Sequence, residues 1–387
     1  MQAKNGFLTS LSINFIHNFI ASGVAVLLPL YLLEKNVSIE SIGLIFSVLS
    51  IIMLVFRFIF AVIADYIGTR LIFIGNAIAH VVTIVTYILS MTPLHFAFGK
   101  IFEGLRAAAF WSVNRTEIYR INAKEAEKNA SIMGAVRSIS TIFGSAAIAI
   151  ALIFFSIQSS FLFLILASIV LFYYSLNVKN GKEKKKLNLS AFMTELKTKR
   201  SKEFWSAALI LSMAAIYEAP ILAIVIPLYM AESLKSQPSM IGIGLALYSA
   251  SFSFASYVAA KYNMRIKSIA FGAIIFGTLP ILFIQNISEN IFLLILFLSG
   301  LGGGFGLINL MEIIMARTVK NSVTPSIDVS ILIMPYRLVE FITLAAIGFA
   351  IINLGFYNVF LVLALSFAAY IFLAWKFLSS LSQKNSH

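Results

Sequence analysis

The sequence predicts an all-α membrane protein with twelve transmembrane helices in two pseudo-symmetric six-helix bundles. Of its 387 residues, 60% are hydrophobic and only 12% are charged, and the mean hydropathy is +0.94. A soluble globular chain is about half apolar and about a quarter charged. Apolar runs of about 20 residues, the length that crosses a bilayer as a helix, recur along almost the whole chain. These runs lack the alternating polarity of outer-membrane strands, so helices are expected.

The apolar runs place the twelve helices in order along the chain, with boundaries good to a few residues. They are expected at 8–33, 41–63, 71–92, 94–117, 130–155, 160–178, 204–230, 239–260, 267–286, 290–315, 328–352 and 357–378. The first run is too long for a signal peptide and lacks a small-residue cleavage site. It is therefore expected to remain as the first span.

The distribution of basic residues predicts the orientation of the chain. Most of the 29 Lys and Arg residues fall in loops and span ends on the side of the N-terminus, whereas the opposite loops hold Lys35 and Lys235. Basic loops stay in the cytoplasm. Both termini are therefore expected on the cytoplasmic side of the cell membrane. This asymmetry explains the net charge of +13 without nucleic acid as a partner.

The longest polar stretch lies in the middle of the chain and divides six spans from six. The predicted organisation is an N-terminal bundle at 1–178, a basic cytoplasmic linker at 179–203 and a C-terminal bundle at 204–387. In the linker, apolar residues recur at helical spacing from Leu189 to Leu196. They fit either a short amphipathic helix on the inner leaflet or a plain loop.

The two halves share a local pattern. Gly104 and Asn114 in the fourth span have counterparts in Gly300 and Asn309 of the tenth, and each Asn is followed three residues later by Glu. An internal duplication, which is common among transporters, explains this likeness. Chance combined with generic Gly-rich packing is the alternative.

The segment at the end of the second span reads Ala61-Val-Ile-Ala-Asp65-Tyr-Ile-Gly68-Thr-Arg70. It resembles the loop signature of the major facilitator superfamily, Gly-x-x-x-Asp-Arg-x-Gly-Arg-Lys/Arg. The match holds at Asp65, Gly68 and Arg70 and fails at Ala61, Tyr66 and Thr69. Gly68 permits a tight turn between antiparallel helices. The resemblance implies a cytoplasmic gate made by Asp65, Gly68 and Arg70, assisted by Arg115; a surface turn capped by Asp is the alternative.

A second segment, in the fourth span, resembles the family's pattern Arg-x-x-x-Gly-x-Gly-x-Ala. Lys100 takes the position of the Arg in this pattern, and Arg106 takes the position of the second Gly. Gly104 and Ala108 match the pattern. The C-terminal loop signature is degenerate, with Ala260 where Asp is expected. The resemblance covers the whole chain and implies a monomer, whose helices one, four, seven and ten line a central cavity.

Several ionisable residues lie inside the predicted spans, where a charge costs at least ~2.5–3.5 kcal/mol on insertion scales. Glu218, Glu103 and Glu340 are the candidate proton carriers, because a carboxyl group that alternates between apolar and cationic surroundings binds and releases a proton. Glu218 is favoured, since no basic residue lies within one turn of it. Static pairing of Lys100 with Glu103 and of Arg337 with Glu340, each three residues apart, is the alternative. A histidine satisfied by contacts between helices is the alternative for His17. Candidate cavity residues are Asn14, His17, Asn18, Lys100, Arg106, Arg137, Tyr217, Asn309 and Arg337.

Other chemistries find little support in the sequence. Cys is absent and the four His residues show no metal-ligand spacing, so no metal or other cofactor is expected. The Gly300–Gly306 cluster lies inside a span without a Gly-Lys-Ser/Thr sequence, which argues against ATP-driven transport. An enzyme acting on lipids is a distant alternative, because no HExxH, Ser-His-Asp or His cluster is present.

The expected function is secondary active transport of a small solute by alternating access, coupled to protons. Export of amphiphilic or drug-like compounds is favoured by the 35 Phe and 14 Tyr residues, although phenylalanine also packs against lipid. Import or uniport of a small polar or anionic metabolite is the alternative, and it is favoured if Lys100, Arg106 and Arg137 converge on one cavity. The expected partners are the solute, protons and the lipid bilayer.

Overall fold

The computed structural model describes residues 2–121, 126–178, 200–262, 264–319 and 325–384, and every element in these ranges is helical. The N half contains α1 (Gln2–Glu34), α2 (Ile39–Ile67), α3 (Thr69–Leu89), α4 (Pro93–Ile121), α5 (Ala126–Phe154) and α6 (Ile157–Leu176). The C half contains α8 (Lys202–Pro220), η2 (Ile221–Val225), α9 (Ile226–Leu228), η3 (Tyr229–Ser233), α10 (Pro238–Lys261), α11 (Ile266–Gly277), η4 (Leu279–Phe283), α12 (Glu289–Gly303), η5 (Gly304–Ile308), α13 (Asn309–Thr318) and α14 (Pro325–Lys384).

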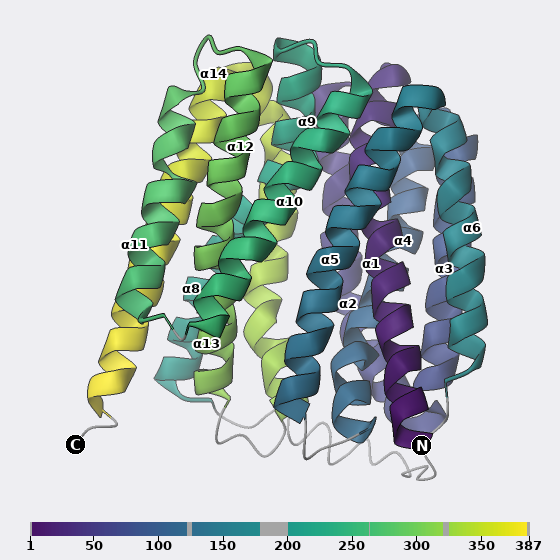
Figure 1. The fold of residues 1–387 in the computed structure, drawn as a ribbon, viewed down its shortest axis with the longest axis vertical. Helices are drawn as coiled ribbons and strands as arrows, with labels where there is room; N and C mark the ends of the chain where they lie inside the picture. Colours follow the sequence, from purple (N-terminus) through teal and green to yellow (C-terminus); the bar gives the residue numbers. More distant parts are fainter. Residues whose placement is uncertain (1, 122–125, 179–199, 263, 320–324, 385–387) are drawn as a thin grey trace.

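The long helices run side by side along the molecule, and both chain ends lie at one end of it (Figure 1). We call this end the terminal face and the other end the opposite face. Three turns, η2, η3 and η5, are π-helical, and they interrupt the helices that begin with α8 and α12. The expected ninth span is α11 followed by the 3₁₀ turn η4.

Ten helices in the described ranges are long and apolar enough to cross a membrane. α4 is not among them, because Lys100, Glu103 and Arg106 lie in its centre. α14 has 60 residues and is broken at Gly355, where φ is 78° and ψ is 160°, and it folds back on itself there (Figure 1). The all-α prediction is confirmed, while the prediction of twelve spans requires α4 and both arms of α14 to count as spans.

The turns between helices follow from local sequence. Ser38, Ser156 and Ser201 cap α2, α6 and α8, each accepting a hydrogen bond from the backbone N–H three residues later. Gly68 joins α2 to α3 with a φ of 83°, a conformation that a residue with a Cβ atom rarely adopts. The predicted tight turn at Gly68 is therefore present.

The two halves meet backbone to backbone near the opposite face, where α2 packs against α14 and α5 against α10. A Cβ atom on Gly43 would collide with the carbonyl oxygen of Leu344, and one on Gly348 would collide with the backbone of Ile39. On the other side of the molecule, a Cβ atom on Gly242 would lie 2.8 Å from that of Ala149. At Gly43 and Gly348 the helices meet through backbone atoms, and at Gly242 the methyl group of Ala149 lies between them.

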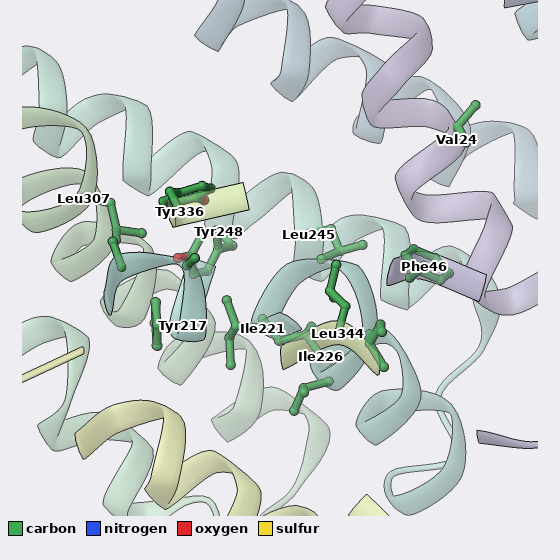
Figure 2. Close-up of a cluster of buried hydrophobic side chains, with 14 of the residues drawn as sticks. Val24, Phe46, Tyr217, Ile221, Ile226, Leu245, Tyr248, Leu307, Tyr336 and Leu344 are labelled. Carbon is green, nitrogen blue, oxygen red and sulfur yellow. The ribbon is translucent and has the colours of Figure 1, made fainter. Parts of the chain in front are cut away.

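One apolar core continues from the N half into the C half. Figure 2 shows part of it, with Val24 and Phe46 from the N half and Ile226, Leu245 and Leu344 from the C half. All five side chains are buried, with at most 5% of their surface exposed. This shared core closes the opposite face.

Along α5 the contact between the halves ends toward the terminal face. Ala149 is buried against α10, whereas Gly134, about four turns nearer to the terminal face, is exposed and has no atom within 4 Å of its Cβ position. Arg137, one turn further along, is also exposed. The seam between the halves is therefore closed at the opposite face and looser at the terminal face.

Candidate functional site

Glu103 is the centre of a buried ion cluster inside the N half. Its carboxylate lies 2.9 Å from Lys100 Nζ and 3.2 Å from an Nη of Arg106, and it accepts a 2.5 Å hydrogen bond from the hydroxyl of Tyr87. Lys100 Nζ also lies 4.0 Å from the ring centroid of Phe46, on α2. Both cations are thus compensated by the one carboxylate of Glu103, and Lys100 also by the π-electron density of Phe46.

Two histidines extend this cluster across the N half. His17 Nδ1 lies 3.3 Å from Asn76 Oδ1 and 3.0 Å from His80 Nε2. Asn76 donates a 2.7 Å hydrogen bond to the carbonyl oxygen of Arg106, which joins the two groups. The ring of His17 stacks on Phe110, with 3.6 Å between centroids. The structure thus places His17, Lys100 and Arg106 in contacts within the N half.

Asn76, His80 and Tyr87 escaped the sequence reasoning although a signal for them exists. They lie on α3 at intervals of four and seven residues, so they share one face of the helix. This face points into the N half, and all three side chains are buried. The spacing of these polar residues along the third span is the signal that predicts a buried polar face.

Asn14 connects helices within the N half, and Asn18 bonds to Asn14 within α1. Asn14 donates a 2.8 Å hydrogen bond to the carbonyl oxygen of Met133 on α5, and Asn18 donates one of 2.7 Å to that of Asn14. Asn114 lies 3.5 Å from the Asn14 side-chain oxygen. At most 7% of either predicted cavity residue is exposed, so both serve packing in this conformation.

Glu218 has a different environment, at the end of α8 and directly before the π-helical turn η2. It accepts a 2.8 Å hydrogen bond from the hydroxyl of Tyr336 on α14, and it is partly exposed. It forms no ion pair within the described ranges. Arg137 of the N half and Arg337 of the C half are among the charges that act on it. Tyr336, like Asn76, His80 and Tyr87, is not among the residues predicted from the sequence.

The other predicted residues of the C half also have partners within that half. Arg337 and Glu340 form an ion pair of 2.6 Å, and Glu340 is 6% exposed. Tyr217 is fully buried and stacks on Phe367, so it points into the C half. Asn309 donates a 2.7 Å hydrogen bond to the carbonyl oxygen of Gly304 and stabilises the π-helical turn η5.

Arg137 is the predicted cavity cation that faces the looser part of the seam. Its guanidinium carbon lies 4.6 Å from the ring centroid of Trp111 on α4, and the residue is exposed. The structure does not bring Arg137 together with Lys100 and Arg106 around one anion site, because those two cations contact Glu103 inside the N half.

Of the residues predicted to form the gate, the structure describes the side chains of only some. Gly68 ends α2 and Arg70 is exposed at the terminal face. The side chains of Asp65 and Arg115 lie outside the described residues, as does the linker at 179–199. The described end of this linker is anchored, since Arg200 forms a 2.9 Å ion pair with Asp328 at the start of α14.

The comparisons with known proteins agree with this architecture. The sequence profile of the Major Facilitator Superfamily matches residues 11–327. The crystal structure of the nucleoside transporter NupG aligns with a TM-score of 0.69 at 16% identity, covering 97% of this chain and 98% of that one. A structure of a mutant form of the same transporter aligns with a TM-score of 0.70 at 14% identity, over 97% and 99% of the two chains. No curated protein matches the sequence.

At such low identity the two solved structures establish the fold, while the sequence profile, which spans most of the chain, establishes the family. The membrane-spanning helices, the two halves with their central seam and the ionisable groups inside the spans all fit a carrier of small solutes. The enzyme alternative is excluded on the same grounds. The chain belongs to the major facilitator superfamily and is a multi-pass membrane transporter.

Proposed function

We propose that the protein is a secondary active transporter that moves a small solute by alternating access and couples this movement to protons at Glu218. The observation that carries the proposal is the environment of Glu218. Its carboxyl group is partly exposed beside the seam and its hydrogen-bond partner is a hydroxyl group. A carboxyl group with such a partner keeps a hydrogen bond in both protonation states, because a hydroxyl can donate or accept.

The other two candidate carriers are less suited to this role. Glu103 contacts two cations and Glu340 contacts one, at distances of 2.6 to 3.2 Å. Protonating Glu103 would leave two buried cations without their partner, which is strongly unfavourable. Protonating Glu340 would leave the partly buried Arg337 without its partner, which is also unfavourable. These contacts support a structural role for Glu103 and Glu340 and leave Glu218 as the carrier.

The terminal face is the cytoplasmic one in this proposal. Arg70, Lys261, Arg265 and Lys267 are exposed there, and basic residues near span ends favour the cytoplasm. The seam is then closed toward the outside of the cell and looser toward the cytoplasm. We propose a monomer, since each half finds its packing partner within the same chain.

The cargo we propose is an uncharged or cationic amphiphile, moved outward. Lys100 and Arg106 form ion pairs with Glu103, so their positive charge is compensated and does not favour an anionic solute. Apolar and aromatic side chains such as Trp111 and Tyr336 accompany Glu218 and Arg137 at the seam. A nucleoside is the second candidate, because the two similar structures are those of a nucleoside transporter, and nucleosides are uncharged molecules with an aromatic ring.

Transport by the purified protein in liposomes tests the coupling. A pH gradient should drive accumulation of a fluorescent cationic amphiphile or, for the second candidate, of a radiolabelled nucleoside. Glu218→Gln should abolish the response to the gradient and retain exchange of solute at equal pH. Glu232→Gln, which changes an exposed carboxylate near the opposite face, is the matched control. Unchanged pH-driven accumulation in a well-folded Glu218→Gln protein would refute the assignment.

A further inference from the structure

The loop that joins α10 to α11 carries positive charge without an acidic partner. Lys261 ends α10, Arg265 directly precedes α11 and Lys267 lies in its first turn, and all three are exposed. The chain has no Asp or Glu from Pro238 to Ser288, so neither helix supplies a carboxylate. In the part of the chain that the structure describes, no acidic side chain of another helix forms an ion pair with these cations.

The backbone keeps the first two of these cations near each other. The N–H of Met264 donates a 3.1 Å hydrogen bond to the carbonyl oxygen of Ala259, so the chain turns sharply at the end of α10. Arg265 follows Met264 directly and therefore stays near the last turn of α10, to which Lys261 belongs. Because like charges repel one another, an anion bound at this turn is favoured.

The corresponding loop of the N half contains the acid that this loop lacks. It joins α2 to α3, the second and third helices of that half, and its sequence includes Asp65 where the C half has Ala260. Ala260 is exposed, so packing does not require a small apolar side chain there. The C half thus has basic residues at this turn and no carboxylate to offset them.

The face of α10 that leads to Lys261 is turned toward lipid. Phe254 and Tyr257 precede Lys261 by seven and four residues, so the three share one side of the helix. This side is about a quarter of a turn away from Gly242, which faces α5 at the seam. More than half of each aromatic residue is exposed. Lys261 Nζ lies 5.5 Å from the ring centroid of Tyr257, and Phe254 is about 10 Å deeper in the bilayer than Lys261.

We propose that the α10–α11 loop binds an anionic phospholipid, whose phosphate lies beside Lys261 and Arg265. An acyl chain of the same lipid follows Tyr257 and Phe254 along α10. The lipid head supplies the negative charge that the loop lacks, and the exposed aromatic side chains contact the hydrocarbon. A free phosphate ion would match the cations alone, whereas a lipid matches both parts of the surface. The inference depends neither on the cargo nor on the coupling residue proposed above.

Native mass spectrometry of the full-length protein in detergent tests this site, with dioleoyl phosphatidylglycerol and dioleoyl phosphatidylcholine as probes. Each basic residue near an anionic lipid contributes about fivefold in affinity. Lys261→Gln should therefore bind phosphatidylglycerol about fivefold more weakly than wild type, and Lys261→Gln combined with Arg265→Gln about 30-fold more weakly. Neither change should affect phosphatidylcholine. Lys202→Gln is the matched control, because it removes an exposed cation at the start of α8, and it should leave both affinities unchanged.

Replacing Ala260 tests the missing negative charge while every cation is retained. Ala260→Asp places a carboxylate in the loop and should weaken phosphatidylglycerol binding about fivefold, because it competes with the lipid for the same cations. Ala260→Asn has the same size without the charge and should bind like wild type. These positions are exposed, so folded variants are expected, and their melting temperatures check this.

Three results would overturn the proposal. The first is equal affinity of wild type, the double variant and Ala260→Asp for phosphatidylglycerol. The second is an equal loss of affinity in Lys202→Gln, which would indicate diffuse attraction by the whole terminal face. The third is displacement of the lipid by inorganic phosphate, which would identify a free anion as the ligand.

Discussion

Replacing Gly348 with alanine tests the closed seam at the opposite face. An added Cβ atom on Gly348 would overlap the carbonyl oxygen of Ile39 and approach the Cα of Glu40, both of which are backbone atoms of α2. Backbone cannot rotate away as a flexible side chain can, so α2 and α14 must separate. Overpacking of this kind costs about 1–3 kcal/mol. Only the conformation closed at the opposite face carries this cost, because the two helices part when the halves rock.

A cost of this size changes the ratio of the two conformations by about 5- to 150-fold in favour of opening at the opposite face. The chain contains no Cys, so one introduced thiol reports on the seam without background. Leu344, whose carbonyl oxygen faces Gly43, is 3% exposed and is a suitable position. Leu344→Cys should react with a polar maleimide at least about fivefold faster when Gly348→Ala is also present.

Gly134→Ala is the matched control for this experiment. It adds the same methyl group to a helix at the same seam, but no atom lies within 4 Å of the new Cβ position. The gain in helix propensity, about 1 kcal/mol, is shared by both substitutions and cancels in the comparison. Equal thiol reactivity in the Gly348→Ala and Gly134→Ala proteins, both well folded, would refute the proposed closure.

Two further predictions concern stability. Glu103→Gln should destabilise the N half by about 3–5 kcal/mol, because it leaves two buried cations with a neutral partner. Thermal unfolding followed by size-exclusion chromatography should show this loss of stability. The control Glu232→Gln, at an exposed carboxylate, should change the unfolding temperature little. Gly68→Ala should cost about 1–3 kcal/mol, since its φ of 83° is strained for alanine; Gly75→Ala, at a helical position with open space, should be neutral or stabilising in the same assay.

Properties that depend on neighbouring residues in the chain could be predicted from the sequence. Helical spans follow from runs of apolar residues, and the turn at Gly68 follows from a short motif. The pairs Lys100–Glu103 and Arg337–Glu340 also fall in this class, because residues three apart on a helix are neighbours wherever the helix lies. The sequence reasoning weighed these pairs as the alternative to proton coupling, and the structure contains both.

Contacts between distant residues could not be predicted in this way. The bonds of His17 to Asn76 and His80 span about 60 residues, and the bond between Glu218 and Tyr336 spans 118. A polar stripe on a helix has the same spacing whether it faces a cavity or another helix. The sequence therefore left His17 open between a cavity position and a contact between helices, and the structure shows it in contacts inside the N half.

The amino-acid sequence by itself determined that this is a helical transporter of the major facilitator superfamily, because hydropathy and short motifs are local properties. Tertiary structure alone decided which face of the molecule is closed and which carboxyl group remains beside the seam. Both depend on how two bundles pack against each other, as at Gly43 and Gly348, where helices from opposite halves approach without side chains between them. No periodicity within either helix encodes that approach, since the partner helix lies about 300 residues away along the chain.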